Sequence, residues 1–248
     1  MKKRFGAIIS VFGVMVSASM AQITNPVPYA DTFENDKYAV GSNLVGTVWQ
    51  GDTNDASAVV TNLSCTSIVG YPVTNATHDQ VLAFSAGVPI TNEFNAAGLA
   101  VVALDTMIKP TFSERPEGSQ MAAVSNSQMS LYIGTNELVN IWHGTGTGWG
   151  APSPSQVQWS EFSQLNVSSG SWVRLTVTLN YLYDDDSGSY SVMMKTAING
   201  QVLTNSLGHS TPSPGVADGG PWFQAASWNN ADARLHRVVL SGLALIHI

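Results

Sequence analysis

Cysteine is almost missing from this chain, because Cys65 is the only one in 248 residues. A single cysteine cannot form an intramolecular disulfide, a CxxC redox motif or a cysteine metal cluster. We interpret Cys65 as a small buried apolar residue, since free cysteines are among the most buried residue types. Stability is therefore expected from a hydrophobic core, which a chain of this length can form.

Charge is scarce as well. Charged residues make up 11% of the chain, and the formal net charge is −7. Nucleic-acid partners need clustered Lys and Arg side chains that face the phosphates. The composition therefore argues against a nucleic-acid partner. Low charge together with many Ser, Thr, Asn and Gly residues is typical of exported β-rich proteins.

A long apolar run is also lacking. The longest such stretch near the start, residues 7–16, follows the basic residues Lys2, Lys3 and Arg4 and precedes small residues up to Ala21. It is well short of the roughly 20 residues needed to span a bilayer. This pattern predicts a secretory signal peptide over residues 1–21 that is removed on export. We therefore expect a secreted or cell-surface protein, residues 22–248, without membrane insertion after cleavage.

Strand patterns dominate the rest of the chain, and helix patterns are nearly absent. Apolar residues alternate with polar ones over 173–181 and again over 190–198, as in an antiparallel sheet with one buried face. Asn199-Gly200 is a strong signal for a two-residue hairpin into residues 201–203. The turn at 134–136 and the proline-rich loops at 151–154 and 211–221 separate further strands. These are expected at 81–84, 99–108, 120–124, 129–133, 138–142, 234–240 and 243–248. The pattern predicts one all-β domain over 22–248, a two-sheet antiparallel β-sandwich.

Four segments in chain order carry a family pattern: residues 31–60, 169–181, 188–201 and 235–248. The first contains Phe33-Glu34, Tyr38, Gly41, Leu44, Trp49 and Gly51. Together these segments resemble the concanavalin A-like, laminin-G-like jelly-roll domains of exported bacterial proteins. The resemblance implies a jelly roll in which the last strand returns beside the first. It does not fix a function, because this fold is shared by lectins, hydrolases, lyases and adhesion modules.

The acidic stretch from Asp184 to Gly188 has two interpretations. Asp, Ser and Gly suit a hairpin turn between the two alternating strands. Alternatively, Asp184 and Asp186 could hold calcium, although the spacing fails the EF-hand pattern because Gly188 is fifth and Lys195 twelfth. We favour the turn. The family resemblance implies that structural calcium is possible near the first and last strands, where Glu34 and Asp52 are the comparable residues; no cofactor is required.

Catalytic patterns are not evident. No Glu-x-Asp pair suits glycoside hydrolysis, and Glu137 and Glu161 stand alone. Tyr132, His143 and Arg174 are of the types that a lyase uses, but their context matches no lyase motif. The segment Gly144–Gly150, GTGTGWG, lacks the Lys of a phosphate loop. Its glycines would instead allow a loop to bend closely around a ligand or a neighbouring strand.

Tryptophans in loops are the better candidates for binding. A protein that binds sugars needs flat apolar side chains for stacking, together with amides and carboxylates that bind the hydroxyl groups. Two segments interpreted as loops, residues 141–150 and 221–232, offer both, and exposure is expected at Trp149 and Trp222 in particular. The candidate ligand-binding residues are Trp142, His143, Trp149, Trp222, Trp228, Asn229 and Asp232.

The sequence thus favours a secreted, non-catalytic, lectin-like module that binds an extracellular polysaccharide or glycan. A structural extracellular protein is the second hypothesis, and an unrecognised glycoside hydrolase or polysaccharide lyase is the third. A lectin should expose tryptophans beside Asn and Asp. A structural subunit should instead expose apolar patches or unpaired strand edges.

Overall fold

The structure is a computed structural model. It describes residues 24–26, 39, 41–42, 58–65, 78–84, 90–95, 99–110, 112, 114–115, 127–146, 150–168, 170–209, 220–227, 235–241 and 245–247. Within these residues no helix is both long and apolar enough to cross a membrane.

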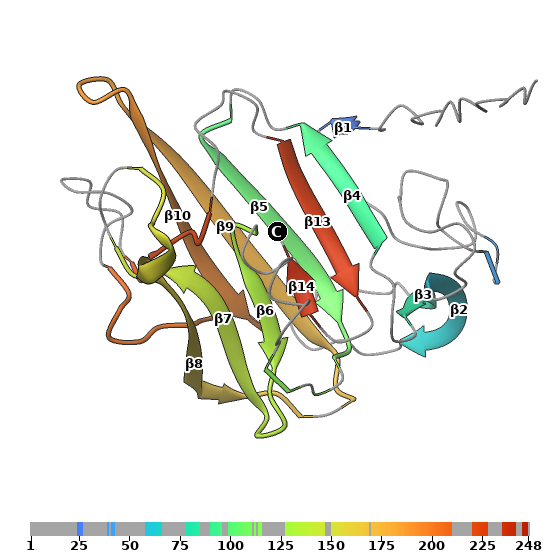
Figure 1. The fold of residues 1–248 in the computed structure, drawn as a ribbon. Helices are drawn as coiled ribbons and strands as arrows, with labels where there is room; N and C mark the ends of the chain where they lie inside the picture. The colour runs from blue at the N-terminus through green and yellow to red at the C-terminus, as the bar shows by residue number, and fades with distance from the viewer. Residues whose placement is uncertain are drawn as a thin grey trace, which may run out of the picture.

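The fold is all-β, as the sequence predicts (Figure 1). Twelve strands form one curled sheet in the order β1-β4-β13-β14-β6-β7-β12-β10-β9-β5, with β11 beside β10 and β8 beside β7. Every pairing in it is antiparallel except that of β1 with β4. Strands β2 and β3 pair separately. The strands are β1 Thr24–Pro26, β2 Ala58–Cys65, β3 His78–Phe84, β4 Ile90–Asn95, β5 Val101–Ile108, β6 Ser130–Ile133, β7 Leu138–Gly144, β8 Val157–Asn166, β9 Val173–Asp184, β10 Ser189–Ile198, β11 Gln201–Val202, β12 Phe223–Gln224, β13 Leu235–Ser241 and β14 Leu245–His247, with one short 3-10 helix at Pro154–Gln156.

The long hairpin of β9 and β10 is the clearest product of sequence alternation. The two strands pair over ten residues, from Ser189 opposite Asp184 to Ile198 opposite Leu175. The predicted apolar face of β9 is buried, and none of its five side chains is more than 8% exposed. Asn199 (φ 51°) and Gly200 (φ 80°) form the predicted turn into β11. Positive φ at both central residues is the mark of a type I′ hairpin.

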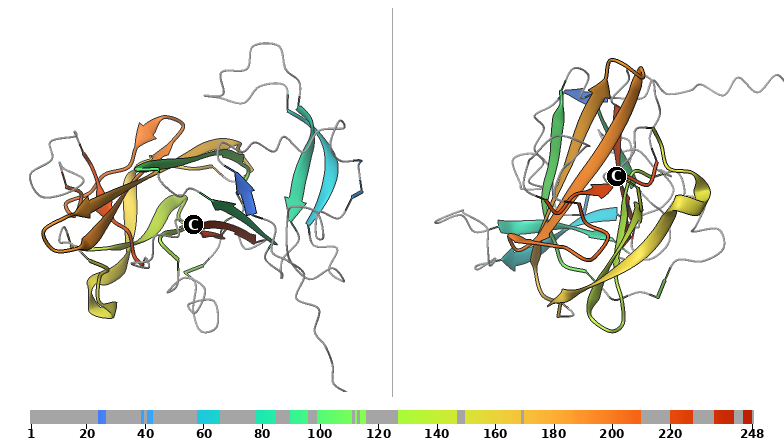
Figure 2. Two further views of the ribbon diagram at one scale, coloured as in Figure 1. Left: turned by 90° about the horizontal axis from the view of Figure 1, so that it is seen from above. Right: turned by 90° about the vertical axis from the view of Figure 1, so that its left-hand side faces the viewer.

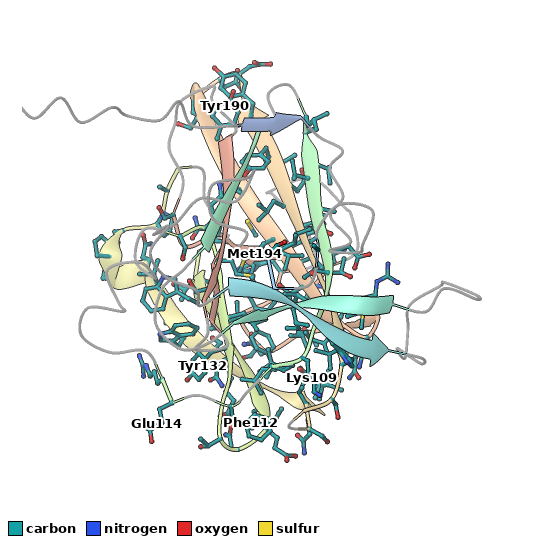
Figure 3. The ribbon with its side chains drawn as sticks, turned by 90° about the vertical axis from the view of Figure 1, so that its right-hand side faces the viewer. Lys109, Phe112, Glu114, Tyr132, Tyr190 and Met194 are labelled. Atoms are coloured by element: carbon teal, nitrogen blue, oxygen red, sulfur yellow. The ribbon has the colours of Figure 1, made fainter. Side chains whose placement is uncertain are left out.

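The core lies on the inner face of the curled sheet. Side chains of β6, β7 and β8 pack there against those of β9 and β10. Strand β12 lies between β7 and β10 and so joins these two parts of the sheet. Figure 2 shows the curl from two directions, and Figure 3 shows Met194 in the interior, between Tyr190 near one end of the molecule and Tyr132 near the other.

Most predicted strands are confirmed, and several observed ones were not predicted. The turn at 134–136 and the loop at 151–154 lie where expected. Strands β1, β2, β4, β8 and β12 had no prediction, and the predicted strand at 120–124 lies outside the described residues. Strand β8 was missed because its pattern alternates poorly: polar side chains stand on both of its faces, and its pairing with β7 holds it in place.

Candidate functional site

Three aromatic side chains gather on the outer face of the sheet, opposite the core. Trp142 of β7 pairs with Trp159 of β8. On β6, Ser130 pairs with Trp142, and Tyr132 lies two residues further on the same face. Successive residues of a strand point to opposite faces, so the neighbours of these three residues along each strand point inward to the core. We call Tyr132, Trp142 and Trp159 the outer aromatic cluster.

The rings of the outer aromatic cluster meet at angles. The centroids of Tyr132 and Trp159 are 4.9 Å apart with an interplanar angle of 79°. Those of Trp142 and Trp159 are 5.6 Å apart at 55°. Edge-to-face contacts of this kind stabilise a pair by about 0.5–1.5 kcal/mol beyond area burial. Tyr132 and Trp142 are buried, whereas Trp159 is partly exposed, so the first two hold the ring of Trp159 in a fixed orientation at the surface.

The indole N–H groups of Trp142 and Trp159 are buried without a hydrogen-bond acceptor among the described residues. A buried donor that lacks its partner costs about 1–3 kcal/mol, and most buried polar atoms in folded proteins are satisfied. Both Nε1 atoms are covered, so an acceptor from outside the chain would reach them only after the side chains around them move aside.

Polar groups border the cluster on the same face. Asn140 and Glu161 face each other across β7 and β8. The Nδ2 of Asn136 donates to Oε2 of Glu161 at 2.8 Å, which leaves the other carboxylate oxygen of this exposed residue toward solvent. Burial raises the pKa of Tyr132, with a smaller lowering from the charge of Arg115 and a raising from that of Glu161. Tyr132 therefore stays protonated at neutral pH and remains a hydrogen-bond donor.

Trp142 and His143 do not share a site, although the sequence analysis grouped them. They are consecutive in β7 and point to opposite faces. His143 is fully buried on the inner face, where its ring lies 4.9 Å from that of Phe223. Its Nδ1–H donates to the Gly144 carbonyl at 2.7 Å, and Nε2 accepts from the Ser160 hydroxyl at 2.7 Å. Burial lowers the pKa of His143, so the neutral ring fills part of the core.

The expected exposure of Trp222 is wrong, since its side chain is 3% exposed. Residues 221–232 were interpreted as a loop, but Trp222 forms a bridge with His209 and leads directly into β12. The ammonium of Lys195 lies 4.2 Å from the centroid of its ring. Its indole N–H is a third buried donor with no acceptor among the described residues.

Two glycines of the GTGTGWG segment serve a neighbouring strand, one of the two predicted uses. Gly144 and Gly146 lie against the side chain of Gln224 in β12, and a Cβ at either position would stand 2.8 Å from its Oε1. Gln224 in turn accepts from the Gly146 N–H at 3.0 Å. Substitution of either glycine would therefore displace Gln224, which lies where β12 joins β7.

The acidic stretch is a hairpin turn, as favoured from the sequence. Asp184 ends β9, Ser189 begins β10, and Asp185 and Asp186 are exposed in the turn between them. No group of three or more His, Cys, Asp or Glu residues suited to a metal ion occurs in the described part of the chain. Other candidates from the sequence lie outside the described residues: Trp149, Trp228, Asn229, Asp232, Glu34 and Asp52.

The three residues of the types that a lyase uses lie in different places on the sheet. Tyr132 is on the outer face and His143 on the inner face of the same part of the sheet. Arg174 of β9 binds Asp105 of β5, with Nε donating to Oδ1 at 2.8 Å. The structure therefore does not assemble Tyr132, His143 and Arg174 into one site.

Sequence reasoning missed Trp159 altogether and treated Glu161 as a solvated surface acid. The signal was the spacing of Trp159 and Glu161, because residues two apart in a strand share one face.

No protein-family model, no curated protein and no solved structure matches the chain.

Proposed function

We propose that this protein is an exported, non-catalytic carbohydrate-binding module whose ligand is an extracellular polysaccharide or glycan. The observation that carries the proposal is the outer aromatic cluster, with a partly exposed Trp159 and two buried indole donors that find no acceptor in the part of the chain that the structure describes. The signal-peptide pattern at residues 1–21 supports export.

The chemistry of the cluster suits a sugar. Sugar rings present apolar C–H faces, which stack on an aromatic ring held in one orientation, and hydroxyl oxygens, which accept hydrogen bonds. Trp159 supplies the ring, and the Nε1 atoms of Trp142 and Trp159 supply donors once the side chains that cover them move aside. The exposed carboxylate of Glu161, held by Asn136, accepts from sugar hydroxyl groups. A small number of placed polar groups around an apolar surface is the usual composition of a ligand site.

The curled sheet is proposed to be a concanavalin A-like, two-sheet jelly roll. Support comes from the packing of β6, β7 and β8 against β9 and β10 across one core. The sequence motifs point to the same fold, and structural calcium at Asp184 and Asp186 or at Glu34 and Asp52 remains part of the proposal.

Binding to a panel of soluble and insoluble polysaccharides tests the proposal. Protein purified after expression of the full chain would be assayed with and without calcium, and released sugars would be measured in the same wells. We expect saturable binding without products. Products would contradict the non-catalytic assignment, calcium dependence would support the metal residues, and no binding across the panel would overturn the proposal.

A structural extracellular role is the second candidate, and one observation favours it. Leu99 and Val101 at the start of β5 are 40% and 51% exposed. Large apolar side chains at the border of a sheet are a feature of surfaces that meet another protein.

A further inference from the structure

Strand β5 lies at the border of the large sheet. Among the described residues it pairs with β9 alone, over the eight residues Val101–Ile108. Figure 2 shows β5, in green, at the margin of the layer that it forms with β9 and β10 (right-hand view). An edge of this length that is unpaired within the described ranges presents a row of backbone N–H and C=O groups that another strand can bind.

Other border strands of this sheet carry features that discourage pairing. Strand β1 is three residues long and ends at Pro26, and β11 has two residues. Strand β8 is long, but the side chains that it exposes are polar and include Glu161. Short length, proline and charge are the usual protections of sheet edges.

Strand β5 lacks these protections. Val101 and Ala103 are exposed, and the strand contains no proline or lysine. Its one charged residue, Asp105, is bound to Arg174, and its Oδ1 accepts from the Thr176 hydroxyl at 3.0 Å. The carboxylate is therefore directed along the face toward β9 and its charge is compensated, so that it opposes an incoming strand weakly.

The backbone groups that face away from β9 belong to the odd-numbered residues. The Tyr181 N–H donates to the Ala100 carbonyl, so even-numbered residues of β5 make the bonds to β9. The outward N–H and C=O groups are then those of Val101, Ala103, Asp105 and Met107, and the side chains of these four residues all lie on the outer face.

We propose that two copies of this chain associate through β5, with the two strands antiparallel about a two-fold axis. In the register that we propose, Leu104 lies opposite Leu104 of the second copy. This register pairs nearly the whole strand and does not place Asp105 opposite Asp105. Val101 then lies opposite Met107, and Ala103 opposite Asp105. On the outer face Val101 thus meets Met107, and each Asp105 lies beside an alanine rather than a like charge. Each pair stays on one face, as a two-fold axis requires. This inference does not depend on glycan binding.

Pairing of one edge buries less than the roughly 1,200 Å² of a stable interface, so we expect a dimer that forms only at high concentration. Sedimentation velocity over a wide range of protein concentration, without glycan, measures it. Val101→Lys, which puts a charge opposite Met107, and Ala103→Glu, which puts a carboxylate opposite Asp105 of the second copy, should each weaken the dimer about tenfold or more. Val202→Lys is the matched control, since Val202 is 38% exposed on β11, away from β5. A wild-type protein that stays monomeric, or a dimer that both β5 variants retain, would overturn the proposal.

Cysteine cross-linking tests the register. In a Cys65→Ser background, a mixture of Val101→Cys and Met107→Cys chains should form a disulfide-linked dimer under mild oxidation, because paired residues bring their Cα atoms to about 5.5 Å. Either chain alone should cross-link far less. Equal cross-linking of one chain alone would contradict the register.

Discussion

The rings of Trp142 and Trp159 lie with their centroids 5.6 Å apart on paired strands, and both indole N–H groups are buried without an acceptor in the described part of the chain. Because both N–H groups are covered, donation to a ligand requires the side chains around them to move aside. The account therefore centres on the outer face of β6, β7 and β8.

Replacing Trp142 with Phe removes one of these donors and keeps an aromatic ring. We expect weaker glycan binding, by about fivefold to tenfold for the loss of one hydrogen bond of about 1 kcal/mol. Isothermal titration calorimetry measures the change. Trp222→Phe is the matched control, because it also removes a buried indole N–H that has no acceptor in the described residues but lies outside the cluster. Equal losses in the two variants would argue for a general packing defect instead.

The Asp105–Arg174 pair predicts a modest dependence of stability on acid. Hydrogen bonds from Arg174 are the main reason that the pKa of Asp105 lies below its usual 3.8. A lowered carboxylate pKa stabilises the fold above the unfolded pKa, and this contribution is lost as pH falls through the range below about 4. Because both side chains are about one-third exposed, Asp105→Asn should cost no more than about 1 kcal/mol at pH 7.

Urea unfolding of dilute protein at pH 7 and pH 3 measures this effect, with Asp185→Asn in the exposed turn as control. The difference between Asp105→Asn and the wild type should shrink at pH 3. A difference that stays constant over this range would contradict the assigned ion pair.

His143 predicts a second pH dependence, between pH 7.5 and 5. Burial holds the pKa of His143 below its usual 6.5. The unfolded chain therefore binds a proton that the folded chain does not, so stability is full above about 6.5 and falls as pH drops below it. His143→Gln should be less stable than the wild type at pH 7.5, yet lose less stability on acidification. Thermal unfolding across this range tests it, and His209→Gln, at a less buried histidine, should retain most of the wild-type loss.

The hairpin turn at Asn199-Gly200 predicts a pure backbone effect. A Cβ at Gly200 would meet nothing within 4 Å, so the cost of Gly200→Ala comes only from its φ of +80°. We expect a loss of about 1–2 kcal/mol in the free energy of unfolding. Asn199→Gly, at the neighbouring positive φ, should cost about 0.5–1.5 kcal/mol, because it removes the Oδ1 that accepts from the Arg174 N–H at 2.9 Å. Chemical denaturation measures both, and a neutral Gly200→Ala would contradict the turn geometry.

The sequence was sufficient for structure that is local. Alternation predicted β9 and β10, and the acidic stretch and Asn199-Gly200 predicted the turns at either end of β10, because each signal lies within a few neighbouring residues. These elements depend on chain geometry more than on distant contacts.

Long-range pairing decided the rest. Trp222 was expected in an exposed loop, but it is buried where its segment enters a two-residue strand between β7 and β10. The cluster was missed because Trp142 and Trp159, which pair across β7 and β8, are seventeen positions apart in the sequence. No local pattern encodes that register. Trp142 and His143 were grouped as one site before their opposite orientations in β7 were known.

The most direct test is the affinity of Trp159→Ala for the glycan that the wild type binds. Tyr183→Ala is the matched control, because Tyr183 is an aromatic side chain that is 52% exposed on β9, outside the cluster. The account predicts that Trp159→Ala loses about tenfold or more in affinity while its fold is retained, and that Tyr183→Ala binds like the wild type. Undiminished binding by a folded Trp159→Ala protein would contradict the outer aromatic cluster as the binding site.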